Sequence, residues 1–404
     1  LASRPADTQY EPVRLPEKLG YGVGDLAAGL MLNFYGFFLL YYFVDIGGLA
    51  PAAIGLMLLL TKLVDAFNDP MMGILAARTR TRWGRYRPYL LFGAEQLGAS
   101  IVLIFSAPAG LGDGWLLAWA YITYTLCMLA FTAVNVPYGG LLGVIHPSSE
   151  VRTSVTAYRM FFSAMGGILV GALGTTLIRE LGGGNEALGL RLTASLIATY
   201  AIFSLFTAFA ATKERVPPAT TNGNALQDVG ALITSGPWIA VAIAAILGVT
   251  SIAARAGTAL FFFKYVVGDD GKPAFLFFDR TALFLTALAL GQVSGVIIGN
   301  LLQRRFETDI AEFIEWISRR QMTARVSAAS VFAVIGGIAF GSAIPGFTLA
   351  LTGFVIDAPQ TESAKFGIQL AFAIIPAAIM IPAAIALLFY GINRNVIARV
   401  ESDL

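Results

Sequence analysis

The sequence has few of the residues that enzymes and disulfide-stabilised domains depend on. It contains one cysteine and one histidine among 404 residues. A single cysteine excludes an internal disulfide and a cysteine-based metal site. With one histidine, no Ser-His-Asp set or metal-ligand cluster is apparent. We therefore expect neither an enzyme nor a bound cofactor.

Charge is also scarce. Charged residues make up 13% of the chain, about half of the roughly 25% found in soluble domains. Hydrophobic residues make up 57%, and the net charge of +2 gives no reason to expect nucleic acid as a partner. Apolar runs long enough to cross a bilayer, which takes about 20 residues, lie at 22–44, 52–76, 88–107, 115–142, 154–178, 190–211, 237–266, 280–303, 322–343 and 367–391. The sequence predicts an all-α polytopic membrane protein embedded in a lipid bilayer.

Basic residues gather in alternate loops. The loop after the second run holds five arginines, whereas residues 46–48 and 108–114 hold no basic residue. These arginines are Arg78, Arg80, Arg82, Arg85 and Arg87. Because cytoplasmic loops are enriched in Lys and Arg, we expect both termini in the cytoplasm and the chain in a bacterial inner membrane.

The second run contains two carboxylates at hydrocarbon depth. Asp65 and Asp69 are four residues apart, so they share one face of a helix, with Asn68 beside them. Each costs about 2.5–3.5 kcal/mol on insertion scales, and such groups usually mark an ion or substrate pathway. A structural ion pair with Lys62 is the alternative, but one lysine cannot neutralise two carboxylates. The pattern therefore predicts a site for a cation or a proton.

The same segment carries a family resemblance. Asp65-Ala66-Phe67-Asn68-Asp69-Pro70, followed by the arginine-rich segment 79–88, resembles the glycoside–pentoside–hexuronide:cation symporters (the melibiose permease-like branch of the major facilitator superfamily). The resemblance implies two six-helix halves and sodium- or proton-coupled symport of a sugar, glycoside or sugar conjugate by alternating access. It implies a monomer, with the loop arginines Arg80, Arg82, Arg85 and Arg87 in the cytoplasmic gate.

The resemblance also implies a cation site and a substrate site. Asp65, Asn68, Asp69 and Thr132 match the cation positions, and oxygen ligands of this kind suit Na⁺, so Asp65 and Asp69 are candidate Na⁺ ligands. Asp25 and Arg159 match sugar contacts of the family, and we expect them to pair across one cavity. The remaining candidates are Asn135 and Arg255.

Several of these positions depart from the family. Asn135 stands where the family has an aspartate and could instead join helices. Arg255 either faces an anionic substrate group or pairs with an aspartate of the first half. Gly139, Val331 and Ile335 replace a sugar-stacking tryptophan, a polar residue and a lysine. The apolar replacements leave a second interpretation open, namely cation-coupled transport of an amphiphile such as a lysolipid or a steroid conjugate.

The polar segment near Pro217 divides the chain into residues 1–211, a cytoplasmic linker at 212–236 and residues 237–404. The first part contains six runs and the second only four. In the family a helical hairpin lies between the positions that resemble Phe306 and Glu307. We expect a hairpin of about two spans to be absent there, either from the given chain or from the protein itself.

Overall fold

The structure, a computed structural model, describes residues 10–216 and 234–392, with gaps at 109, 270, 276–277, 293, 295–309, 311–313, 315, 317–322, 357 and 391. Most of the predicted linker and the predicted break between 306 and 307 lie outside the described residues. The regular structure of the described residues is helical, as predicted.

The first half contains six helices. They are α1 (Leu15–Tyr41), which continues as a π-helical segment η2 (Tyr42–Ile46), α2 (Pro51–Arg78), α3 (Arg87–Ile104), α4 (Asp113–Ile145), α5 (Ser149–Gly182) and α6 (Glu186–Ala211). The six runs predicted in this half all coincide with these helices. Prolines at the start of α2 and α3 suit the first helical turn, whose N–H groups lack intrahelical partners. The Asn185 side chain accepts a hydrogen bond from the N–H of Leu188 and so caps α6.

The second half follows the predicted runs as well. Its elements are α8 (Gly236–Phe261) with the π-helical η3 (Phe262–Val267), a helix at 280–292, α10 (Thr323–Leu351), and α11 (Glu362–Gln369), which continues through η4 (Leu370–Ile374) into α12 (Ile375–Leu388). Within the described residues, eight helical segments are long and apolar enough to cross a membrane. The 18-residue α3 is less apolar, because it carries Arg87 and Glu95, and it packs against α4 and α6.

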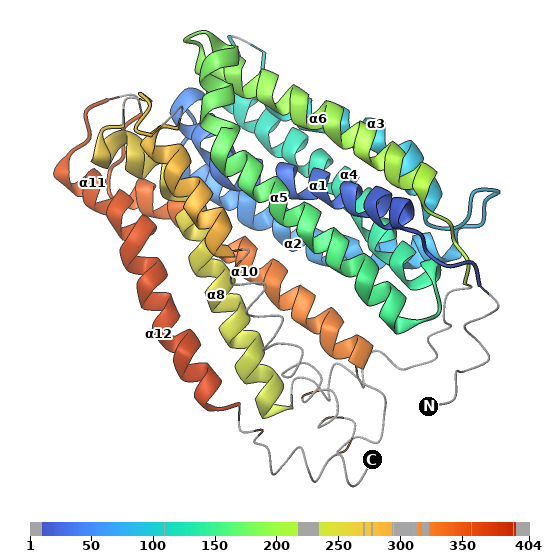
Figure 1. Cartoon of the computed structure of the whole chain (residues 1–404). Helices are drawn as coiled ribbons and strands as arrows, with labels where there is room; N and C mark the ends of the chain where they lie inside the picture. Colours follow the sequence, from blue (N-terminus) through green and yellow to red (C-terminus); the bar gives the residue numbers. More distant parts are fainter. Residues whose placement is uncertain are drawn as a thin grey trace.

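The two halves meet along pairs of helices and diverge toward one end (Figure 1). α1 contacts α8, α2 contacts α10, and α5 approaches residues 280–292. We call the end that contains η2, η3 and the start of α11 the closed end. The end with the α2–α3 loop and the first turns of α1 is the basic end. In Figure 1, α8, α10 and α12 separate from the first half toward the basic end.

Small residues allow the helices to approach closely. A Cβ atom added to Gly29 of α1 would lie 2.2 Å from the Ser163 carbonyl oxygen of α5, and one on Gly346 of α10 would lie 2.5 Å from the Pro51 carbonyl oxygen of α2. Small residues at such positions are typical of membrane helix contacts, where packing replaces the hydrophobic effect as the driving force. The α1–α5 contact places Asp25 and Arg159 next to each other.

We predict that Gly29→Ala lowers the thermal unfolding temperature of the detergent-solubilised protein. The added methyl group meets a backbone oxygen that cannot rotate away, and such overpacking costs about 1–3 kcal/mol. Gly36→Ala is the matched control on the same helix, because its Cβ would have no neighbour within 4 Å. Equal unfolding temperatures for the two variants would contradict this account of α1–α5 packing.

Candidate functional site

The predicted cation site begins with Asp65 on α2. Its side chain is buried, with 6% of the residue exposed. Lys62, one turn earlier, donates a hydrogen bond from Nζ to Asp65 Oδ2 at 2.9 Å, and Nζ also lies 3.2 Å from Met128 Sδ of α4. The other carboxylate oxygen, Asp65 Oδ1, is buried and has no hydrogen-bond partner among the described residues. The lysine thus satisfies only half of this carboxylate.

Asp69 supplies a second carboxylate one turn further along α2. Thr132 of α4 is buried and donates a hydrogen bond from Oγ1 to Asp69 Oδ1 at 2.8 Å. Pro70 lies inside α2 and has no N–H, so the Ala66 carbonyl is deprived of its usual helical donor. Asn68 is half-buried, and its side chain makes no hydrogen bond to another described residue. The site therefore combines two carboxylates, one ammonium, a hydroxyl and an unused carbonyl.

The predicted pair of Asp25 and Arg159 is present. Arg159 Nε and Nη2 each donate to one carboxylate oxygen of Asp25 at 3.2 Å. Asp25 is 9% exposed and comes from α1, whereas Arg159 comes from α5. The two-point contact uses the planar fork of the guanidinium, which a lysine could not reproduce. The side chains are 12% exposed for Asp25 and 21% exposed for Arg159.

Two tyrosines form a platform for this pair, and sequence reasoning did not assign them a role. The rings of Tyr21 and Tyr138 stack with centroids 4.6 Å apart, and each hydroxyl donates to the backbone carbonyl of the other tyrosine. The Arg159 guanidinium carbon lies 4.7 Å from the Tyr138 ring centroid, a cation–π distance. Gly24 permits this packing, because a Cβ there would lie 2.9 Å from Tyr138. The sequence feature that could have indicated this close packing is the glycine-rich segment before Asp25.

The other two predicted substrate residues are not part of this cluster. Asn135 lines a small cavity of about 20 Å³ inside the first half, together with Gly24, Leu97 and Ala201. Arg255 is half-buried on α8 and has no ion-pair partner within the described part of the chain. The pairing of Arg255 with an aspartate of the first half is therefore not seen among these residues.

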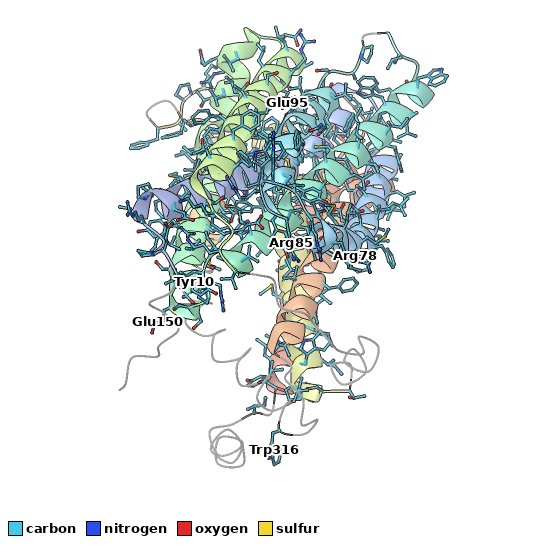
Figure 2. The ribbon with its side chains drawn as sticks, turned by 90° about the vertical axis from the view of Figure 1, so that its right-hand side faces the viewer. Tyr10, Arg78, Arg85, Glu95, Glu150 and Trp316 are labelled. Carbon is cyan, nitrogen blue, oxygen red and sulfur yellow. The ribbon has the colours of Figure 1, made fainter. Side chains whose placement is uncertain are left out.

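The arginine loop at the basic end is held by a carboxylate that the sequence analysis missed. Glu214, just after α6, accepts hydrogen bonds from the backbone N–H groups of Arg85, Tyr86 and Arg87 at 2.8, 2.8 and 3.1 Å. Arg87 also donates from Nε and Nη2 to the Phe209 carbonyl oxygen. Figure 2 looks onto this end and labels Arg85 and Arg78. The loop conformation is thus fixed by the end of α6.

A second ion pair lies beside this loop. Arg215 donates to both carboxylate oxygens of Glu17, at 2.7 and 2.8 Å, and both side chains are largely buried. This hydrogen bonding raises the pKa of Arg215 above its ordinary value. The predicted loop residues Arg80 and Arg82 have other surroundings. Arg80 is exposed, and Arg82 stacks on Trp83 at 4.1 Å.

The closed end contains a polar network that joins the two halves. Lys264 of η3 donates to Asp45 Oδ2 of η2 at 2.5 Å and to the Tyr41 hydroxyl at 2.9 Å. Tyr265 donates to the other oxygen of Asp45, and Tyr41 donates to Glu186 Oε2 at 2.7 Å. The Asp45 side chain is 1% exposed. The buried Asp45 carboxylate therefore receives its hydrogen bonds from Lys264 and Tyr265.

A second cross-contact lies next to it. Arg179 of α5 donates to the Gly271 carbonyl oxygen, and its Nη1 lies 3.9 Å from Asp279 Oδ2. Burial raises the pKa of the Asp279 carboxyl. A cavity of about 420 Å³ lies between these contacts, lined by Arg179, Glu186, Lys264 and Asp279 among others. The polar contacts described here between the halves thus lie at the closed end.

Solved structures with the same arrangement are helical transporters. A bacterial homologue of the human peptide transporters PepT1 and PepT2 aligns with a TM-score of 0.64 at 13% identity and covers 92% of this chain and 97% of that chain. A bacterial homologue of the human lysosomal transporter Spinster aligns with a TM-score of 0.55 at 12% identity, covering 100% and 99%. At such low identity the likeness concerns the fold alone.

The sequence comparison identifies the family. Residues 20–279 and 273–394 match the model of the family described as MFS/sugar transport protein, and the chain belongs to this family. It is similar to the inner membrane symporter YicJ of Escherichia coli (29% identical, 98% of this chain and 95% of YicJ) and to the putative glycoside/cation symporter YagG of Escherichia coli (27%, 96% and 94%). An isoprimeverose transporter of Lactiplantibacillus pentosus is 25% identical over 97% of this chain and 92% of that protein.

This membership confirms two expectations. The chain is a multi-pass membrane protein with a transport role, and the resemblance to the symporter family is correct. The alignment with YicJ extends over 442 positions, more than the 404 residues of this chain, so YicJ has residues without a counterpart here.

We predict that Lys264→Met opens the closed end. Removing one partner of a fully buried ion pair costs about 3–5 kcal/mol. The Lys264 side chain is 35% exposed, so we expect a smaller shift of about 1–3 kcal/mol, which is about 5-fold to 150-fold in the open population. Spin labels on Leu181→Cys and Phe275→Cys would report the distance between halves, because the native Cys127 is buried. Lys365→Met is the control, because Lys365 has similar exposure (38%) but pairs with Glu362 of its own helix rather than across the halves. An unchanged distance distribution in Lys264→Met would show that Lys264 does not hold the two halves together at the closed end.

Proposed function

We propose that this protein is a cation-coupled symporter of a sugar, glycoside or sugar conjugate. The observation that carries the proposal is the pair Asp65 and Asp69 within the apolar helix α2. Among the described residues only Lys62 forms an ion pair with them, and Asp65 Oδ1 has no hydrogen-bond partner. A second carboxylate in an apolar membrane helix is expensive unless a cation or proton joins it. The names of the relatives YicJ and YagG, both symporters, support the same conclusion.

The coupling cation would bind between α2 and α4. Asp65, Asp69, Thr132 and Asn68 offer oxygen ligands, which suit a hard cation, so we favour Na⁺ over a proton. Loading would neutralise the carboxylates. Coupling follows if the carrier switches between its inward-open and outward-open states only when it is empty or when it holds both cation and substrate. The cation gradient then drives substrate uptake.

The substrate would bind at Asp25 and Arg159, on the platform of Tyr21 and Tyr138. Hydroxyl groups can donate to Asp25 and accept from Arg159, and an aromatic face suits the apolar side of a sugar ring. Arg255, a half-buried cation on α8 without an ion-pair partner among the described residues, would face an anionic group of the substrate. Asn135 lies farther inside the first half and would act through Tyr138, with which it shares a cavity.

A second candidate function is cation-coupled transport of an amphiphile such as a lysolipid or steroid conjugate. The observation in its favour is the apolar surface of α10, where Val331 is 58% and Phe332 is 61% exposed. Uptake of radiolabelled glycosides and of amphiphiles into proteoliposomes, under imposed Na⁺ and pH gradients, separates the two functions. We also propose a monomer in the bacterial inner membrane with both termini in the cytoplasm, working without a cofactor.

We predict that Asp65→Asn and Asp69→Asn each abolish cation-driven accumulation of substrate in proteoliposomes. The amide keeps the shape of the side chain but removes the charge that attracts the cation. Substrate exchange without a cation gradient should persist in both variants, because Asp25 and Arg159 are unchanged. Asp113→Asn, at the exposed start of α4, is the control.

The cation itself is tested in the same assay. A Na⁺ gradient at constant pH should drive uptake, whereas a pH step without Na⁺ should not. Full accumulation by Asp65→Asn or Asp69→Asn would disprove the assignment of the site. Uptake driven only by the pH step would show that the coupling ion is a proton and not Na⁺.

We predict that Asp25→Ala weakens substrate binding by at least tenfold. The change removes a hydroxyl acceptor and leaves Arg159 without its partner, a loss that costs about 3–5 kcal/mol for buried pairs. Arg159→Lys should weaken binding as well, because a lysine cannot make the two-point contact. Calorimetry with glycosides, free sugars and amphiphiles measures the effect, with Glu362→Ala, 90% exposed at its side chain, as the control. Tight sugar binding that Asp25→Ala leaves unchanged would show that the substrate lies elsewhere.

A further inference from the structure

An apolar groove of about 410 Å³ runs along the first half between α3 and α4. Figure 1 shows α3 on the side of the first half away from α8, α10 and α12. The groove is separate from the Asp65 and Asp25 sites. Its lining includes Tyr89, Phe92 and Gln96 of α3 and Leu126, Leu129 and Ala130 of α4. Phe92 is 57% exposed and Leu126 is 49% exposed. The groove therefore presents aromatic and aliphatic surface to the surroundings of the helices.

The length of the groove fits one leaflet of a bilayer. On α3 it extends from Pro88 to Gln96, which is about 12 Å at 1.5 Å per residue. The hydrocarbon core of a bilayer is about 30 Å thick, so the groove covers most of one half of it. The groove starts at the basic end, where Thr79 is part of its lining. A hydrogen bond of 2.6 Å joins Thr79 Oγ1 to the Tyr89 hydroxyl.

Two arginines, Arg78 and Arg82, adjoin residues that line or contact the start of the groove. Arg78 precedes Thr79 in the chain and is exposed. Arg82 stacks on Trp83, whose ring lies 5.7 Å from that of Phe92 in the groove. Neither arginine has an ion-pair partner within the described part of the chain. Aromatic residues such as Trp83 and Tyr89 are typical of the membrane–water interface, so the charges lie at headgroup level and the groove below it.

The other arginines of the loop are engaged differently. Arg85 and Arg87 donate to the carbonyl oxygens of Ala77 and Phe209. Arg80 lines a separate open hollow beside Glu214 and Arg215. Glu214 fixes the loop backbone at residues 85–87, and Arg82 stacks on Trp83. This part of the loop is therefore ordered without a ligand, which lowers the entropic cost of binding one.

We propose that this groove and the two arginines form a binding site for one anionic phospholipid. An acyl chain occupies the groove, and the phosphate and anionic headgroup contact Arg78 and Arg82. The charge complementarity selects an anionic over a zwitterionic lipid, since each arginine near a membrane surface favours anionic lipid by roughly fivefold. The site is structural or regulatory and is independent of the transported substrate.

Native mass spectrometry of the full chain in detergent tests the proposal. Phosphatidylglycerol and phosphatidylcholine with the same acyl chains are titrated in turn, with deacylated glycerophosphoglycerol as the headgroup alone. We expect one tightly bound phosphatidylglycerol, at least tenfold weaker phosphatidylcholine, and no retained glycerophosphoglycerol. Arg78→Gln and Arg82→Gln should each weaken phosphatidylglycerol by about fivefold, and together by about 25-fold. Arg80→Gln is the matched control in the same loop and should change the affinity by less than twofold.

The groove is tested separately. Ala130→Leu fills it with an apolar side chain and should weaken both phospholipids without changing the preference between them. Unfolding temperatures of all variants show that each is folded. Equal affinity for the two phospholipids, or an equal effect of Arg80→Gln and Arg82→Gln, would overturn the headgroup contact. Undiminished binding in Ala130→Leu, or retention of glycerophosphoglycerol as strong as that of the lipid, would overturn the acyl-chain contact.

Discussion

The structure depends on one constraint, namely that a buried charge needs a partner. Asp25 meets Arg159, Asp65 meets Lys62, and Asp45 meets Lys264. The first and third pairs join different helices, so the requirement for neutrality also decides which helices lie together. Asp69 and Arg255 differ, because neither has an ion-pair partner among the described residues, and Asp69 is bound by the Thr132 hydroxyl. The incompletely neutralised carboxylates of α2 are where the proposed cation would bind.

The contact between the halves follows a repeated plan. α1 and α8 are the first helices of their halves, and both end in a π-helical segment, η2 and η3. Such segments are frequently found at functional sites. Here they supply Asp45 and Lys264, which meet across the interface. Close glycine contacts between α2 and α10 and between α5 and residues 280–292 complete the junction. The closed end is thus built from corresponding parts of two similar bundles.

The sequence predicted what depends on local spacing. The helix positions follow from apolar run lengths, and the shared face of Asp65 and Asp69 follows from the helical repeat. The pairing of Asp25 with Arg159 needed the family resemblance, because 134 residues separate them. Neither route identified Glu214 or the Lys264–Asp45 pair, which spans 219 residues and uses charges that resemble ordinary helix-end residues. The direction in which Asn135 points could not be predicted, since a half-buried amide suits either a ligand or a neighbouring helix.

The position of Lys62 has a consequence for how the proposed cation site would release its cation. Its ammonium is attached to the same helix as Asp65, one turn away, and cannot diffuse from the site. A group tethered in this way competes at an effective concentration on the order of millimolar. A cation that binds both carboxylate oxygens of Asp65 would have to displace the Lys62 ammonium. The ammonium would bind Asp65 again when the cation leaves. The lysine would therefore set an upper limit on the cation affinity of the proposed site, and it would neutralise one of the two carboxylates when no cation is bound.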